Sequence, residues 1–91
     1  MHGPWVVMLN TEGTMMGSAF VLITTEIDSQ EEVLQALRNT GNVKDAYAVS
    51  GVYSIIARLE AESMVELKNI VSKTIRSLPG VRSTLTMVVT S

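Results

Sequence analysis

Two short stretches with helical periodicity separate four strand-like stretches, and this order limits the fold more than any other feature of the chain. In the first stretch, DSQEEVLQALRNTGNV, Val33, Leu34 and Leu37 recur at the spacing that places them on one face of a helix. The second stretch opens at Ser63, and its apolar stripe is predicted to contain Leu67, Ile70, Val71, Thr74, Ile75 and Leu78. We therefore expect two amphipathic helices, each with one face turned toward a core.

Both helical stretches carry signals at their ends. Ser29 stands three residues before Glu32, and Ser63 stands three residues before Glu66, so each pair is predicted to form a capping box. Asp28 with Glu31 offers the same pattern one step earlier. Gly41 lies where a left-handed residue commonly ends a helix, and a Pro-Gly pair follows the second stretch. These signals predict two short helices.

The remaining stretches are predicted to be strands. The segment AFVLITTE is rich in β-branched residues and apolar on both sides in its first half, which is typical of a central strand. DAYAVS and VYSIIARLE form two strands joined around Gly51, and STLTMVVT forms the last strand. In the third strand, alternation assigns to one face Tyr53, Ile55, Ala57 and Leu59. The order β-α-β-β-α-β predicts an α+β fold, the ferredoxin-like sandwich, with a four-stranded antiparallel sheet and both helices on one face.

This architecture leaves one sheet face without helices. We expect that face to be mainly apolar and to include Ile56, Val88 and the methyl groups of Thr84 and Thr86. Apolar surface contributes about 25 cal/mol for each Å2 removed from water, so such a face favours burial. Two copies packed sheet on sheet across a two-fold axis would bury it, and we expect a dimer or a larger assembly.

The residues needed for most catalytic chemistry are missing. The chain has no cysteine, and its one histidine, His2, lies in the N-terminal segment. A thiol nucleophile, a thiolate metal site and a Ser-His-Asp arrangement in the body of the domain are therefore excluded. Four carboxylates near the start of the first helix complement its dipole better than they suggest a metal site: Glu26, Asp28, Glu31 and Glu32. Because no P-loop or Rossmann motif is present either, we predict a non-enzymatic protein without cofactor or metal.

Charge and the length of apolar runs restrict the partners. The net charge is −2 and the seven basic residues are scattered singly, so we expect no direct binding to nucleic acid. The longest apolar runs have five residues, far short of the roughly 20 that span a bilayer, and the N-terminus lacks a signal-peptide pattern. We expect a cytoplasmic protein without membrane contact. Residues 1–17 are interpreted as an appended tail or an extra strand, and residues 18–91 as the domain.

Two motifs connect this sequence to a known family. AVSGVYS resembles the Val-Thr-Gly-x-Tyr-Asp hairpin, and LPGVRSTLT the Leu-Pro-Gly-Val-x-x-x-x-Thr motif, of the Lrp/AsnC transcription regulators. The two motifs stand in the family's order, with a helix between them. About residues 18–91 therefore resemble the effector-binding domain of that family, the regulation-of-amino-acid-metabolism (RAM) domain. Family members carry a helix-turn-helix domain upstream, whereas the segment before the first strand here has no helical pattern. The resemblance therefore implies a stand-alone version of the module, without its own DNA reader.

The resemblance also implies an effector site at the hairpin bend and on the last strand. Its residues would be Ser50, Gly51, Val52, Tyr53, Ser54, Thr84 and Thr86. Glycine lets the backbone approach a small ligand and offer its N–H to a carboxylate, and hydroxyl groups can both donate and accept hydrogen bonds. Ser54 stands where the family usually has Asp. The lost charge-assisted bond to an ammonium group, worth about 1.5–3 kcal/mol, predicts weakened or altered effector binding.

Several functions fit these observations. The first is an amino-acid-binding module whose dimers assemble into octamers or decamers, as family members do, with the ligand at the contact between dimers. The second is a pure interaction partner of full-length Lrp/AsnC regulators that binds no effector. The third, which the missing side chains argue against, is an oxygenase of the dimeric α+β barrel type. Gly51 can also be read as a simple turn residue, Tyr53 as a core residue, and both threonines as ordinary strand residues.

Overall fold

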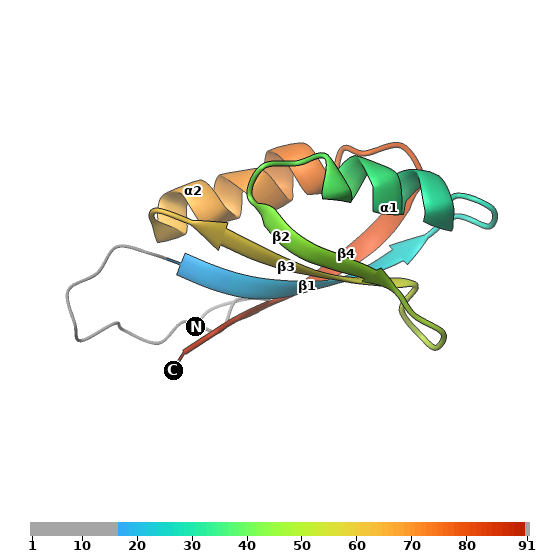
Figure 1. Ribbon diagram of the computed structural model, residues 1–91, viewed down its shortest axis with the longest axis horizontal. Helices are drawn as coiled ribbons and strands as arrows, with labels where there is room; N and C mark the ends of the chain where they lie inside the picture. Colours follow the sequence, from blue (N-terminus) through green and yellow to red (C-terminus); the bar gives the residue numbers. More distant parts are fainter. Residues whose placement is uncertain (1–16, 91) are drawn as a thin grey trace.

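The computed structural model describes residues 17–90, in which two helical segments cover one face of a sheet (Figure 1). In chain order the elements are β1 (Gly17–Thr25), α1 (Gln30–Arg38), β2 (Val43–Ala48), β3 (Ile55–Ala61), α2 (Met64–Asn69), its π-helical continuation η1 (Ile70–Ile75) and β4 (Val81–Val88). The four strands are ordered β2-β3-β1-β4, and every neighbouring pair is antiparallel. The predicted ferredoxin-like sandwich is confirmed, with β1 in a central position. The predicted tail, except for Gly17, lies outside the described residues.

The core lies between the helices and the sheet face that they cover. Its largest fully buried side chains are Val21, Ile23, Val33, Leu37, Ile55, Leu59, Leu67 and Ile75. All of these are aliphatic, and each contributes about 1.5–3 kcal/mol relative to an exposed side chain. Two of the few aromatic residues, Phe20 and Tyr47, are exposed instead, so the helix-free face contains large apolar side chains that the core does not use.

The faces of β4 are the reverse of the prediction. The register pairs Val21 with Thr86 and Ile23 with Thr84, and residues directly opposite one another in an antiparallel pair share a face. Because the β1 partners are fully buried beneath the helices, Thr84 and Thr86 face the core, as does Val88. The predicted contribution of these three residues to the helix-free face is therefore wrong. A shift of one residue moves every side chain of a strand to the other face, and the strand pattern alone did not determine the shift.

The helix ends differ from one another. The Ser63 hydroxyl accepts a hydrogen bond from the Glu66 backbone N–H at 3.1 Å, as a capping serine in extended conformation should. Ser29 has φ −103° and ψ −1°, outside the extended region that capping needs, and its side chain makes no capping bond within the described chain. Gly41 is not left-handed, and just after α1 the Thr40 hydroxyl donates to the Ala36 carbonyl at 2.9 Å. The capping box at Ser29 and the left-handed Gly41 are thus wrong predictions.

The second helix changes its winding halfway along. From Ile70 to Ile75 it is π-helical, with the Arg76 N–H donating to the Val71 carbonyl five residues earlier at 3.0 Å. The wider turn brings both Ile70 and Ile75 into the core and leaves Thr74 exposed. Thr74 was expected in the apolar stripe because that expectation assumed a continuous α-helix.

Candidate functional site

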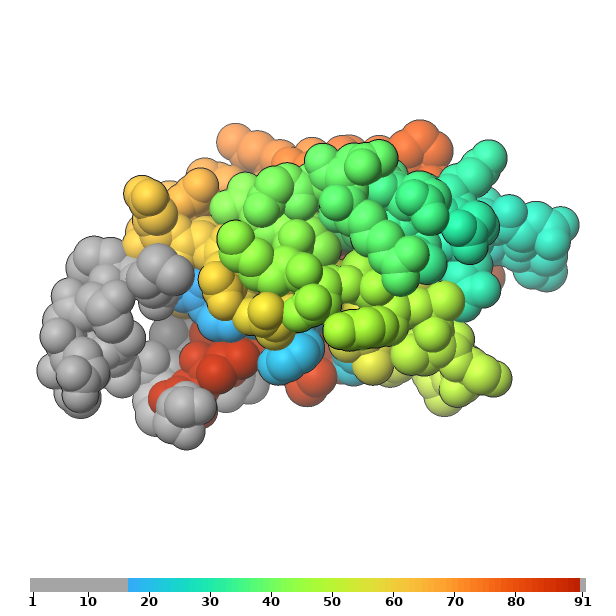
Figure 2. All heavy atoms as spheres, in the orientation of Figure 1, coloured from blue at the N-terminus to red at the C-terminus, as the bar shows by residue number. Residues whose placement is uncertain are grey.

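The bend between β2 and β3 projects from the same end of the molecule as the turn between β1 and α1 (Figure 2). Ser50, Gly51 and Val52 are exposed, whereas Tyr53 and Ser54 are half-buried. Gly51 has φ +154°, and no atom of the described residues lies within 4 Å of the position that a Cβ atom would occupy. The backbone of Gly51 is therefore open to a ligand on that side.

The base of this bend is held by a dense set of hydrogen bonds. The Val49 N–H donates to the Ser54 carbonyl at 2.8 Å, and the Ser54 N–H donates to the Ile23 carbonyl of β1 at 2.8 Å. The Gln30 side chain, at the start of α1, donates from Nε2 to the Ser54 carbonyl at 2.8 Å and to the Val49 carbonyl at 3.4 Å. Strand β1 and helix α1 thus fix the two ends of an otherwise exposed loop.

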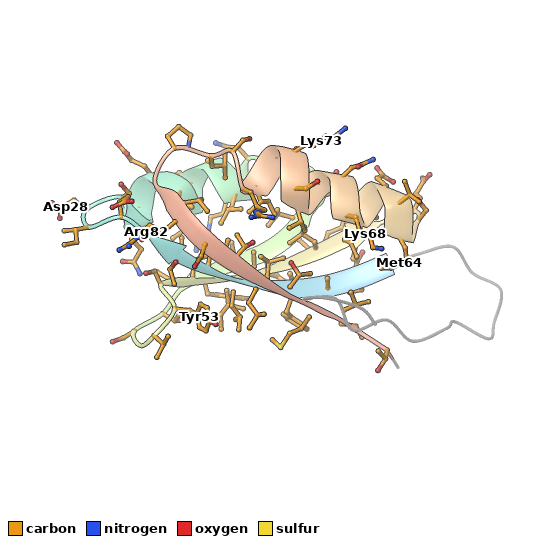
Figure 3. All side chains as sticks on the ribbon, turned by 180° about the vertical axis from the view of Figure 1, so that it is seen from behind. Asp28, Tyr53, Met64, Lys68, Lys73 and Arg82 are labelled. Carbon is orange, nitrogen blue, oxygen red and sulfur yellow. The ribbon has the colours of Figure 1, made fainter. Side chains whose placement is uncertain are left out.

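Tyr53 and the two threonines of the predicted site lie in three different surroundings. Tyr53 lies on the side of the sheet away from the helices (Figure 3), because it precedes β3 and does not follow the alternation of that strand. Thr84 is half-buried and is the register partner of Ile23 in β1. On the opposite edge of β1, the Ile23 carbonyl accepts the hydrogen bond from the Ser54 N–H. Thr86 lies deeper along β4, only 4% exposed. The structure thus places Ser54 and Thr84 on either side of β1, and Thr86 in the core.

A pair of hydroxyl groups near the bend was missed by the sequence analysis. Thr24 of β1 and Ser83 of β4 are register partners, and their Oγ1 and Oγ atoms are 2.6 Å apart. Both residues have the parity of the helix-free face, at the same end of the sheet as the bend. The sequence did contain a signal for this pair, because Thr24 and Ser83 are polar residues at the ends of otherwise apolar sets of alternate positions in their strands. Gln30 was missed as well, because a glutamine in a first helical turn usually faces solvent.

Apolar side chains form a continuous row across the helix-free face. Register pairs join Tyr47 to Ile56, Ile56 to Leu22 and Leu22 to Leu85, so the row crosses all four strands. Phe20 and its partner Met87 extend it along β1 and β4, with exposures of 38% and 42%. Figure 3 shows these strands presenting side chains on the side opposite the helices. We call this set of six residues the apolar row.

A cluster of charges lies beside the apolar row on β2 and β3. Arg58 Nε is 2.9 Å from Asp45 Oδ2, and Arg58 Nη1 is 2.7 Å from Glu60 Oε2. The hydrogen bonds that the guanidinium donates to Asp45, and secondarily to Glu60, raise the pKa of Arg58 above its ordinary value. The guanidinium therefore keeps its charge, and that charge is matched by neighbouring carboxylates.

The described surface also has a depression of about 350 Å3 at the other end of β2 and β3. It is lined by Asn42, Lys44, Glu60, Ala61, Glu62 and Glu66. Within residues 17–90, no three histidine, aspartate or glutamate side chains are grouped so that they could hold a metal ion. In the same part of the chain, no helix is long and apolar enough to cross a membrane.

Comparison with known proteins identifies the family. Residues 18–91 match the Lrp/AsnC ligand binding domain. An uncharacterised HTH-type transcriptional regulator of Pyrococcus furiosus is 34% identical over 74 residues, which are 78% of this chain and 49% of that protein. The chain thus spans about half the length of this relative.

Solved structures show the same fold. A hypothetical protein of Pyrococcus horikoshii is 31% identical, with a TM-score of 0.78 over 85% of this chain and 92% of its own. A transcriptional regulator of Neisseria meningitidis, solved as a complex with L-methionine, is 19% identical, with a TM-score of 0.77 over 94% of this chain and 58% of its own. With the two motifs, the βαββαβ sheet and the family match in agreement, the chain belongs to the Lrp/AsnC ligand-binding domain family.

Proposed function

We propose that this chain is a non-enzymatic, oligomeric module that binds a free amino acid and acts in transcription regulation. The observation that carries the proposal is the β2–β3 bend, where the open backbone of Gly51 is mounted on a base fixed by β1 and α1. The family is described as ligand-binding, and one structural relative is a complex with L-methionine. The relative from P. furiosus is described as a transcriptional regulator and not as an enzyme.

The bend suits the two charged ends of an amino acid differently. The Gly51 N–H, flanked by Ser50 and Val52, would donate to the ligand carboxylate, because no side chain blocks its approach. Tyr53 and Ser54 would supply hydroxyl groups near the ammonium group. Without the usual Asp at the Ser54 position, the ammonium group would lose a bond worth about 1.5–3 kcal/mol. The module should therefore bind an amino acid weakly, or prefer one whose side chain makes up the difference.

The two threonines would contribute unequally to this site. Thr84 is half-buried and lies across β1 from Ser54, so it could reach a ligand at the end of the sheet. Thr86 is nearly inaccessible and would act through the packing of β4 against the helices. The hydroxyl pair of Thr24 and Ser83 would line the open side of the same end.

Self-association completes the proposal. The apolar row is too hydrophobic for a water-facing surface, and two copies packed sheet on sheet would bury it. Dimers would then assemble into an octamer or a decamer, with the bends at the contacts between dimers. A ligand bound at such a contact favours the assembly that completes its site, because it binds that state better than the others.

A thermal-shift titration with each of the twenty amino acids tests the proposal. A ligand at a hundred times its Kd should stabilise the protein by about 2.7 kcal/mol and raise its melting temperature. Ser54→Ala should reduce the shift, whereas Ser77→Ala, which removes a hydroxyl bonded to the Lys73 and Thr74 carbonyls of the second helical segment, should leave it unchanged. Unchanged melting with all twenty would rule out a free amino acid as the effector.

A second function has its own support, since the P. furiosus regulator matches this chain over about half its length. The chain could co-assemble with such full-length regulators through the apolar row and bind no effector. Native mass spectrometry of a mixture would contain species with both chain lengths. Two separate sets of homo-oligomers would eliminate this alternative.

A further inference from the structure

Gln30 is the first residue of α1, yet its side chain bonds outside its own helix. Its Nε2 atom lies 2.8 Å from the Ser54 carbonyl and 3.4 Å from the Val49 carbonyl, and the residue is half-buried. Gln35 on the same helix shows the ordinary behaviour, because it is exposed and bonds to Glu31 of the helix itself at 3.1 Å. The amide of Gln30 therefore links a helix to a loop that lies 19 to 24 residues away.

The two carbonyls that Gln30 reaches are the two ends of the bend. Val49 and Ser54 enclose residues 50–53, and one backbone hydrogen bond, from the Val49 N–H to the Ser54 carbonyl, closes this loop. An amide NH2 group has two hydrogens to donate, so one side chain can hold both ends at once. Without it, a loop closed by one backbone bond and largely exposed to water would open more often.

The first turn of α1 is itself held by the other motif. A Cβ atom on Gly80 would lie 2.7 Å from Ser29 Cβ and 3.2 Å from Val33 Cγ2, so the backbone before β4 lies directly against the helix start. The Glu26 N–H also donates to the Gly80 carbonyl at 2.8 Å. The start of α1 thus contacts the Pro-Gly segment on one side and, through Gln30, the bend on the other.

We propose that Gln30 is a positioning residue that keeps residues 50–53 in the conformation that binds the ligand. The proposal rests on the proposed function of the bend. Gln30 bonds to backbone carbonyls at the base of the loop and acts on the ligand only through them. If only molecules with an ordered bend bind the ligand, the apparent affinity for the ligand decreases as the fraction of such molecules decreases.

The test compares Gln30→Met with the matched control Gln35→Met, since methionine keeps the length of the side chain and removes its donor. Hydrogen exchange without ligand should become about five- to tenfold faster at the hydrogen-bonded amides of Val49 and Ser54 in the first variant, and stay unchanged in the control. The Kd for an amino acid that stabilises the wild type should rise in inverse proportion to the fraction of molecules with an ordered bend, by at most the same factor. Gln30→Lys, which restores a donor, should recover part of both losses.

Each outcome decides the proposal. Faster exchange together with weaker binding, limited to Gln30→Met and lessened in Gln30→Lys, supports it. Unchanged exchange in the bend overturns it, and so does faster exchange with an unchanged Kd. If the wild type binds none of the amino acids, the proposed function is wrong, and Gln30 then cannot position a binding site for an amino acid. In that case the exchange rates still show whether Gln30 holds the loop in place.

Discussion

Adding one methyl group at Gly80 should destabilise the whole domain. The backbone φ there is +93°, a region that costs a residue with a side chain about 1–3 kcal/mol. The new Cβ atom would also lie 2.7 Å from Ser29 Cβ and 3.0 Å from Ser29 Oγ, and such overpacking costs about 1–3 kcal/mol more. Gly80→Ala should thus lower the free energy of unfolding by about 2–6 kcal/mol, a large part of the roughly 5–14 kcal/mol expected for a chain of this length.

Urea unfolding followed by circular dichroism measures this loss. Gly41→Ala is the matched control, because Gly41 has no atom of the described chain within 4 Å of an added Cβ and no left-handed φ. That substitution should be neutral or stabilise by up to about 1 kcal/mol. Combining Gly80→Ala with Ser29→Gly removes the closest contact and should recover part of the loss. The reasoning is refuted if Gly80→Ala unfolds at the wild-type urea concentration, or if both alanine variants are equally destabilised.

Three further predictions concern binding, assembly and charge. Ser54→Asp should tighten the binding of an amino acid by roughly ten- to a hundredfold in calorimetry, because it restores a charged partner for the ammonium group; an unchanged Kd would place that group elsewhere. Leu22→Glu should convert oligomers to monomers in sedimentation, whereas Val65→Glu, at an exposed helix position, should not. The raised pKa of Arg58 favours the folded state at every pH below the pKa of an unfolded arginine, and this benefit is lost only as pH rises through the higher pKa of the folded state. The stability difference between wild type and Arg58→Met should therefore not change between pH 6 and 10 through arginine titration, as pH-dependent melting would show.

The order of elements could be predicted because it depends on local periodicity. Val33, Leu34 and Leu37 recur at helical spacing, and all three are buried as that spacing requires. Gln30 could not be recognised in the same way, since its partners are 19 and 24 residues away and are backbone carbonyls, which carry no side-chain signal. The Thr24–Ser83 pair spans 59 residues and depends on strand register.

The prediction of a capping box at the first helix was wrong for a different reason, namely competition between local and tertiary contacts. Ser29 and Ser63 have the same sequence signal, a glutamate three residues later, but only Ser63 caps its helix. Ser29 lies against Gly80, and its backbone is bent away from the extended conformation by the turn before α1, where Asp28 has φ +72°. A capping motif predicts a helix start, whereas the bond itself forms only if the neighbouring loop allows the geometry.

The orientation of β4 carries an argument about assembly. In an isolated domain, the larger apolar side chains of a strand should face the core, which would place Leu85 and Met87 beneath the helices. The register instead places Thr84 and Thr86 there and leaves the leucine and methionine on the helix-free face, opposite Leu22 and Phe20 of β1. This orientation leaves the two larger side chains unburied within one copy and concentrates apolar surface where another copy could cover it. The strand therefore makes physical sense as part of a two-sided sheet, with one face covered by its own helices and the other by a second sheet.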